Sequence, residues 1–150
     1  METKIIETIQ RIQAASGNTA CPGVKKTKEG YEFTLELPRG KEAALVLYVK
    51  EKKETRSIEI PFSEESRRGN LVSLLVKGLP KGEVCYNYRI DGEIKQDAYA
   101  KALRNVPPFG IRQEEHEGQE LCCVEQEQEF AWTDENFVPK PLKDSLLYKL

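Results

Sequence analysis

Hydrophobic and polar residues alternate over several short stretches of this chain, and a period of two predicts β-strands. Between Tyr31 and Leu37 every second side chain is aromatic or aliphatic, and the residues between them are Glu or Thr. The stretch Ala43–Val49 is apolar on both faces, which is typical of a central strand. Asp91-Gly92 predicts a two-residue hairpin turn, because both central positions of a type I′ turn need a positive φ. The predicted strands are Tyr31–Leu37, Ala43–Val49, Ile58–Phe62, Leu71–Val76, the two strands of the hairpin around Asp91-Gly92, and Leu121–Val124.

The first residues follow a different period. Ile5, Ile9 and Ile12 fall on one face of a helix predicted over Thr3–Ala15, and Ser16-Gly17-Asn18 is a plausible stop. The pattern leaves two alternatives open, a helix that packs against the edge of the domain and a mobile appendage.

About seven short strands, with turns roughly every 8–12 residues, are typical of an antiparallel β-sandwich. No helical pattern alternates with the strands, which disfavours a parallel α/β sheet. The sequence therefore predicts an all-β fold, an immunoglobulin-like antiparallel β-sandwich with a short N-terminal helix. Within the hairpin, the spacing of Tyr86 and Tyr88 with Ile90 favours burial in the core over a binding surface.

Composition excludes several classes of function. The 150 residues carry 23 Lys and Arg against 25 Asp and Glu, and this balance offers no footprint for nucleic acid or an acidic membrane. The chain begins without a signal-peptide pattern and has no apolar run long enough to cross a membrane. We therefore expect a cytoplasmic protein with no nucleic-acid or membrane partner.

The residues that could hold a metal or cofactor are few. The four cysteines include no CxxC pair, which makes a zinc or thioredoxin-like site improbable, and we expect four reduced thiols. The adjacent Cys122 and Cys123 should point to opposite faces of their strand. The single histidine, His116, lies in an acidic run and favours simple surface exposure. We expect no metal and no cofactor.

The composition changes near residue 130. Pro139 and Pro141 favour an extended connector, and the apolar run Leu146–Leu150 resembles the start of a further strand. We expect a chain cut at a domain boundary, because an unpaired apolar strand is seldom left exposed. The predicted organisation is a helix and lead-in (1–22), the sandwich (23–129), and a linker with a truncated strand (130–150).

Three pieces of the sequence, in this order, resemble one enzyme family. They are Gly30-Tyr31-Glu32-Phe33 with Leu45-Val46-Leu47-Tyr48; Arg68-Gly69-Asn70, Gly78-Leu79-Pro80, Tyr86 to Gly92 and Asp97-Ala98-Tyr99-Ala100-Lys101; and Phe130-Ala131-Trp132, Pro139, Pro141, Asp144 and Leu146 to Leu150. The chain resembles the N-terminal part of bacterial pullulanases and glycogen-debranching enzymes of the α-amylase superfamily (glycoside hydrolase family 13). The resembling domain is an early-set, immunoglobulin-like domain similar to family-48 carbohydrate-binding modules. The resemblance as a whole, with the linker and first barrel strand, covers roughly Gly23 to Leu150.

This resemblance implies a parent enzyme that hydrolyses α-1,6-glucosidic bonds, with the third piece as linker and first strand of its catalytic barrel. A retaining glycosidase needs two carboxyl groups roughly 5–5.5 Å apart, and barrel enzymes carry such groups at the ends of several strands. None of those positions lies in this chain, so we assign no catalytic residue. Asp97-Ala98-Tyr99-Ala100 also departs from the family's usual Asp-Pro-Tyr-Ala.

The sugar platform of the family is altered as well. Where glycogen-binding relatives have a tryptophan and a lysine, this chain has Ile94 and Asn87. Aliphatic Ile94 lacks the flat face that stacks on a glucose ring, which leaves Asn87 as a weak candidate for a sugar contact. The single tryptophan, Trp132, favours packing at the domain boundary.

Three functions remain as hypotheses. The first is a non-catalytic accessory domain that packs beside its own catalytic barrel. The second is a functional glycogen- or starch-binding module, with α-glucan as its ligand. The third, from a different class, is an immunoglobulin-like protein-interaction domain with no relation to sugars.

Overall fold

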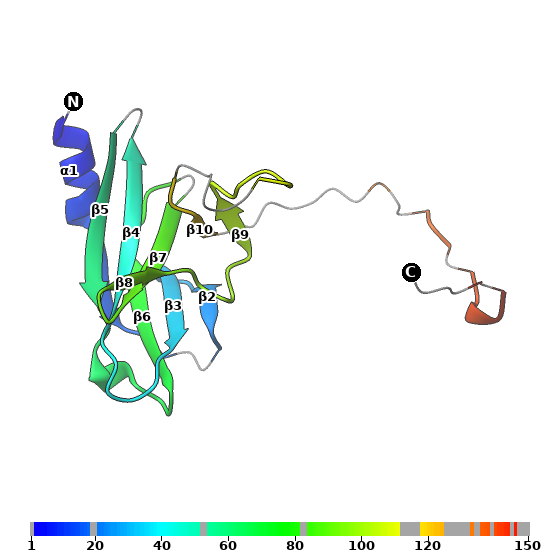
Figure 1. The fold of residues 1–150 in the computed structure, drawn as a ribbon, viewed down its shortest axis with the longest axis horizontal. Coiled ribbons are helices and arrows are strands. Elements are labelled where there is room, and N and C mark those ends of the chain that lie inside the picture. The colour runs from blue at the N-terminus through cyan, green and yellow to red at the C-terminus, as the bar shows by residue number, and fades with distance from the viewer. Residues whose placement is uncertain are drawn as a thin grey trace.

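The chain forms two antiparallel sheets and one N-terminal helix (Figure 1). The computed structural model describes residues 2–18, 21–51, 54–81, 84–111, 118–124, 133, 136–138, 140–144 and 146. Its elements are α1 (Glu2–Arg11), β1 (Gln13–Ser16), β2 (Gly23–Lys26), β3 (Tyr31–Glu36), β4 (Ala43–Glu51), β5 (Glu54–Pro61), η1 (Glu64–Ser66), β6 (Leu71–Lys77), β7 (Val84–Ile90), β8 (Glu93–Lys95), β9 (Ala102–Arg104), β10 (Leu121–Val124) and η3 (Leu142–Asp144).

The two sheets divide the strands unequally. One sheet has the order β1-β6-β3-β2, and the other has the order β5-β4-β7-β10-β9. Strand β8 pairs with the second half of β7, and β10 pairs with the first half of the same edge. The predicted all-β, immunoglobulin-like sandwich is thus confirmed, and β4 is an interior strand as its apolar pattern predicts.

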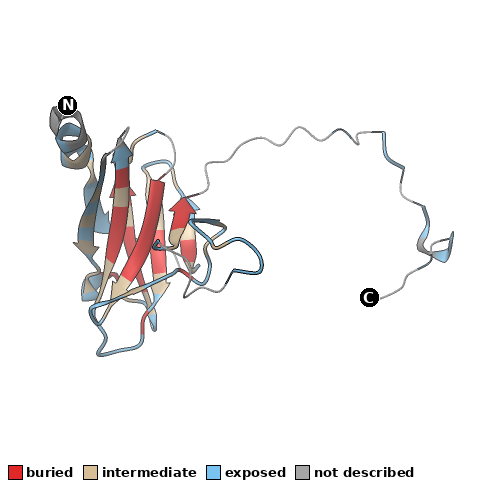
Figure 2. Cartoon of the chain, turned by 45° about the horizontal axis from the view of Figure 1, so that its top comes forward, coloured by how far each residue is buried: buried red, intermediate tan, exposed pale blue. Residues whose placement is uncertain are grey.

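The core lies between the two sheets, where buried residues line the inner faces of the strands (Figure 2). Phe33 of β3 meets Tyr86 of β7 edge to face, with ring centroids 5.2 Å apart, and Tyr86 meets Tyr88 in the same way at 5.7 Å. Each fully buried aromatic side chain contributes roughly 1.5–3 kcal/mol through its removed apolar surface. The predicted burial of Tyr86 and Tyr88 is confirmed.

The hairpin between β7 and β8 turns where the sequence predicts it. Asp91 and Gly92 have φ values of 48° and 86°, the two positive values that a type I′ turn requires. The carboxylate of Asp91 accepts a hydrogen bond from the backbone N–H of Glu42 and forms an ion pair with Lys41. The hairpin is therefore also tied to the residues that lead into β4.

The N-terminal prediction was wrong at its C-terminal end. The helix stops at Arg11, and Gln13–Ser16 form β1, in which Ala14 is paired with Val76 of β6. The cause is tertiary: β6 offers an open edge of backbone donors and acceptors, and pairing with it outweighs the helix propensity of Ala14 and Ala15. The segment 13–15, predicted as the last part of the helix, thus belongs with Ser16 to a strand of the first sheet.

Three short strands, β1, β2 and β9, join the seven predicted ones. At the other end of the chain, the described residues Phe137, Val138 and Leu146 are largely exposed. Leu147 to Leu150, and with them most of the predicted truncated strand, lie outside the described residues.

Candidate functional site

Asn87, the candidate for a sugar contact, is fully buried on β7, with 0% of its surface exposed. Its Nδ2 donates to the carbonyl oxygen of Glu120 at 2.9 Å, and its Oδ1 accepts from the backbone N–H of Cys122 at 3.3 Å. The side chain therefore satisfies backbone groups at the start of β10, at the point where β8 and β10 share one edge of β7. This gives Asn87 a role in joining strands, and its contact with sugar stays a prediction.

A shallow depression of about 410 Å³ lies beside the Asn87 side chain. Asn87 and Ile94 both line it, together with Gln96 and Glu120, whose side chains are hydrogen-bonded to each other. The hairpin thus brings together Asn87 and Ile94, the two positions that were weighed as a sugar contact from the sequence. The lining residues include no aromatic ring, so the depression offers polar contacts without a stacking face.

Asp97 carries a structural role that the sequence pattern did not reveal. Its Oδ2 accepts from the Tyr86 hydroxyl at 2.7 Å, its Oδ1 accepts from the backbone N–H of Tyr99 at 2.9 Å, and its own N–H donates to Cys122 Sγ at 3.2 Å. The Asp97-Ala98-Tyr99-Ala100 motif is thereby fixed to the core across both β7 and β10. Tyr99 leaves about half of its surface exposed, and the group that anchors the motif is the carboxylate of Asp97.

Burial and the nearby Asp97 carboxylate also shift the pKa values of the two core tyrosines, Tyr86 and Tyr88. Burial raises the pKa of Tyr86 far above its usual value, with Tyr88 and the bonded Asp97 adding to the effect. Burial likewise raises the pKa of Tyr88 well above the ordinary range, and the negative charge of Asp97 adds to this. Among the described residues, the hydroxyl of Tyr88 is buried without a hydrogen-bond partner. Both hydroxyls stay protonated, which suits a structural role and gives no general base.

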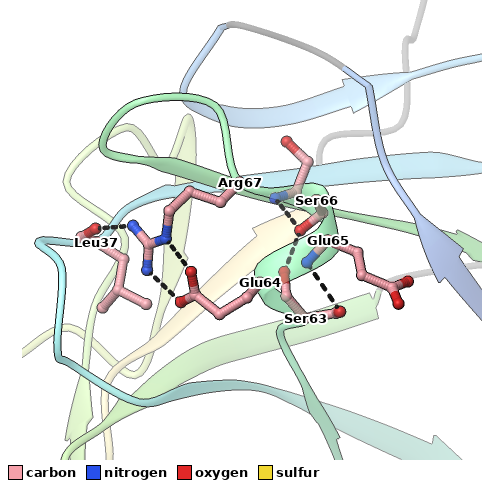
Figure 3. Close-up of polar contacts among 7 residues, drawn as sticks. Leu37, Ser63, Glu64, Glu65, Ser66 and Arg67 are labelled. Carbon is pink, nitrogen blue, oxygen red and sulfur yellow. Dashed lines mark hydrogen bonds and ion pairs between the residues drawn. The ribbon is translucent and has the colours of Figure 1, made fainter.

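A second hollow, of about 550 Å³, lies where β4 and β5 meet the loops at one end of the sandwich. Two of its lining residues, Leu37 and Glu64, are hydrogen-bonded to Arg67, which follows η1 (Figure 3). The guanidinium donates two hydrogen bonds to Glu64, at 2.6 and 2.7 Å, and a third to the carbonyl oxygen of Leu37 at 2.6 Å. Ser63 caps η1 by accepting from the N–H of Glu65. Arg67 thus connects η1 to Leu37, the residue that follows β3.

Ion pairs also cover the outer face of the larger sheet. Arg89 of β7 donates to Glu59 of β5 with a closest distance of 2.6 Å. Since β4 lies between these strands, the pair spans the outward side chains of Ala44 and Val46. This explains why Val46 is buried although it points away from the core.

The described carboxylates that have a shifted pKa are all held in the charged form. A hydrogen bond from a neighbouring Lys or Arg lowers the pKa of each of these groups, namely Glu29, Glu59, Glu64, Asp91 and Glu93. A glycosidase general acid needs the opposite shift. Across residues 2–18, 21–51, 54–81, 84–111 and 118–124, no cluster of His, Cys, Asp and Glu could hold a metal ion.

These lowered pKa values predict weak acid sensitivity. A carboxyl whose folded pKa lies below its unfolded value stabilises the fold above the unfolded value, and this contribution is lost as the pH falls through the folded pKa. We expect Tm to stay level from about pH 7 to pH 5 and to fall below about pH 4. Because the pairs are exposed, 1 M NaCl should reduce the part of this loss that comes from the ion pairs. A Tm that rises below pH 4 in thermal scans would contradict this assignment.

His116 and Trp132, two residues that the sequence singles out, lie outside the described residues. The described part instead reveals an exposed apolar segment in β9 and the loop that follows it, which sequence reasoning missed. Phe109 is fully exposed, and Leu103, Val106 and Ile111 are each at least 40% exposed. The signal was present in the run Val106-Pro107-Pro108-Phe109-Gly110-Ile111, where apolar residues stand in a proline-rich stretch without a strand or helix period.

Fold and surface together define a β-sandwich domain of immunoglobulin-like type, with an apolar loop segment and no assembled catalytic group among its described residues. No family model matches the chain, and no curated protein resembles it significantly in sequence. No helix among the described residues is both long and apolar enough to cross a bilayer.

Proposed function

We propose that this chain is a non-catalytic N-terminal accessory domain of an α-amylase-superfamily glycoside hydrolase that acts on α-1,6-glucosidic bonds. The domain packs beside its own catalytic barrel and shapes the approach of the glucan to it. The ordered sequence resemblance supplies the family, and the immunoglobulin-like sandwich is the fold that the resemblance implies.

The observation that carries the proposal is the apolar segment formed by β9 and the loop that follows it, defined here by Leu103, Val106, Phe109 and Ile111. Exposed apolar side chains gathered in one segment mark interaction surfaces. Exposure of a phenylalanine side chain to water is unfavourable, and this cost disappears when a neighbouring domain covers the side chain. Docking against a barrel would remove these side chains from water.

The gene itself provides the first test. We expect the reading frame to continue past the codon for Leu150 into a barrel with two carboxylates at the ends of its strands. The isolated chain should release no reducing ends from pullulan, whereas the longer product should release them. A stop codon directly after Leu150, or pullulan hydrolysis by the isolated chain, would overturn the proposal.

Replacing Phe109 by Glu tests the docking surface in the longer product. Burial of a Phe side chain is worth roughly 1.5–3 kcal/mol, so we expect thermal inactivation of the longer product to be at least ~10-fold faster. The Tm of the isolated chain should not change, because Phe109 is already exposed there. Ile6→Glu, at another exposed apolar position, is the matched control. Equal inactivation rates for Phe109→Glu and Ile6→Glu would contradict docking through this segment.

A glucan-binding module is the second candidate, and the depression beside Asn87 and Ile94 is the observation that favours it. Its lining includes Asn87 and Ile94, the two positions that the sequence resemblance matches to a sugar platform. The absence of an aromatic ring among its lining residues argues for weak binding at best.

Affinity electrophoresis in glycogen separates the two candidates. We expect the native chain to migrate without retardation and Ile94→Trp to be retarded, because an indole restores the flat face that stacks on a glucose ring. Ile94→Leu, which keeps an aliphatic side chain, is the control. Retardation of the native chain would favour the module, and migration of Ile94→Trp without retardation would show that the depression is not a glucan platform.

A further inference from the structure

The outer face of the larger sheet brings two thiols into contact. Cys85 of β7 and Cys123 of β10 are directly paired in register, and their sulfur atoms are 3.1 Å apart. They lie in a row that also contains Tyr48 on β4 and Ala102 on β9. None of the four cysteines is disulfide-bonded.

The backbone geometry suits a covalent bond between them. Directly opposed residues of an antiparallel pair have Cα atoms roughly 4.5–5.5 Å apart, within the range of about 4.4–6.8 Å that disulfides occupy. The two side chains already point toward each other on the same face. No movement of the strands is required to join them.

The other two thiols compete poorly for this bond. Cys122 points into the core on the opposite face of β10, and burial raises the pKa of its thiol, which disfavours the reactive thiolate. Cys21 is exposed, lies before β2 and has no strand register with the pair. The fold therefore selects one pairing out of the six that four cysteines allow.

We propose that Cys85 and Cys123 form a reversible disulfide, a redox-sensitive clamp between β7 and β10. The oxidant is a low-molecular-weight disulfide such as oxidised glutathione. One protein thiolate attacks a glutathione sulfur, forms a mixed disulfide and releases one glutathione. The second protein thiolate attacks the protein sulfur of that mixed disulfide and releases the other glutathione. Two electrons pass from the protein thiols to the oxidant, and the two protons end on the released glutathione thiols.

The clamp would close a loop that contains β8, β9 and the apolar segment. Residues 85 and 123 are 38 positions apart, and a cross-link over such a loop restricts the unfolded chain. Oxidation should therefore stabilise the domain. Since the thiols are 9% and 5% exposed, we expect the exchange to proceed through local opening of the short strand β10.

The test incubates the full chain with oxidised glutathione and maps its peptides without reduction. We expect a cross-linked peptide pair that contains Cys85 and Cys123, a loss of two hydrogens from the intact protein, and a Tm about 5–15 °C higher. Dithiothreitol should reverse all three changes. Cys122→Ala should keep the cross-link, and Cys123→Ala should abolish it, with thermal scans of the reduced variants showing that each is folded.

Other outcomes decide against the proposal. A glutathione adduct on Cys21 alone, with Cys85 and Cys123 still alkylated as thiols after equilibration, would overturn it. A cross-link between Cys85 and Cys122, retained in Cys123→Ala, would overturn the assigned pairing. A cross-link that forms only in urea, after the fold is lost, would also contradict a clamp built into the native sheet.

Discussion

Replacing Asp97 by Ala should destabilise the domain by about 3 kcal/mol, the larger part of the stability of a marginal domain. The carboxylate is 6% exposed and accepts from both the Tyr86 hydroxyl and the backbone N–H of Tyr99. Alanine leaves both donors buried or half-buried without their partner, at a cost of roughly 1–3 kcal/mol for each. Urea unfolding of the variant, followed by far-UV circular dichroism, measures the change.

Asp91→Asn is the matched control for this prediction. Asp91 is also a carboxylate of the hairpin region and is hydrogen-bonded, yet it lies at the surface, and Asn tolerates its positive φ. We expect Asp91→Asn to change the free energy of unfolding only slightly. A double-mutant cycle with Tyr86→Phe isolates the hydroxyl–carboxylate bond, and the two changes should be clearly non-additive. An Asp97→Ala variant as stable as Asp91→Asn would refute the anchoring role.

The strands that could be predicted are those whose signal is local. In β3 and β7 the alternation of apolar and polar residues is read directly from the sequence, and it placed Tyr86 and Tyr88 in the core correctly. The turn at Asp91-Gly92 follows from the backbone preference of two residues alone. Local preference and tertiary structure agree at these positions, so the sequence sufficed.

The misses occur where a neighbour distant in sequence decides the outcome. Ala14 and Ala15 favour a helix, but the open edge of β6 draws them into β1. Cys123 occupies an outward position of its strand and is nevertheless buried, which the pattern of a single strand does not indicate. The short β9 has only three residues and takes its register from β10. No period can be read from so few positions.

At the candidate site, too, local features could be predicted from the sequence, whereas contacts between distant residues could not. The sequence located the hairpin and singled out Asn87 and Ile94, and the structure brings these two residues to one depression. It did not indicate that the amide of Asn87 is engaged by Glu120 and Cys122, since these partners lie more than thirty positions away. Nor did it indicate that Asp97 reaches Tyr86. The motif that carries the resemblance is thus, in this chain, a device that holds strands together.

The N-terminal segment gives the second large effect. Gly78 follows β6 with a φ of +76°, and a Cβ built on it would lie 2.1 Å from the carbonyl oxygen of Arg11, where α1 ends. Gly78→Ala therefore incurs the left-handed backbone cost of roughly 1–2 kcal/mol and a backbone clash that costs about 1–3 kcal/mol. We expect a total loss of about 2–5 kcal/mol, or detachment of β1 from β6 where that relieves the clash at a lower cost.

Gly40→Ala separates the two costs. Gly40 has a comparable φ of +82°, but nothing lies within 4 Å of its added Cβ, so this variant carries the backbone cost alone. Urea unfolding of both variants gives the clash as their difference, and amide hydrogen exchange at Gln13–Ser16 reports whether β1 stays paired. If β1 and the end of α1 dock as the structure has them, Gly78→Ala must either lose more stability than Gly40→Ala or lose the protection of these amides. Equal stability with full protection would show that the end of α1 does not approach Gly78 as closely as the structure has it.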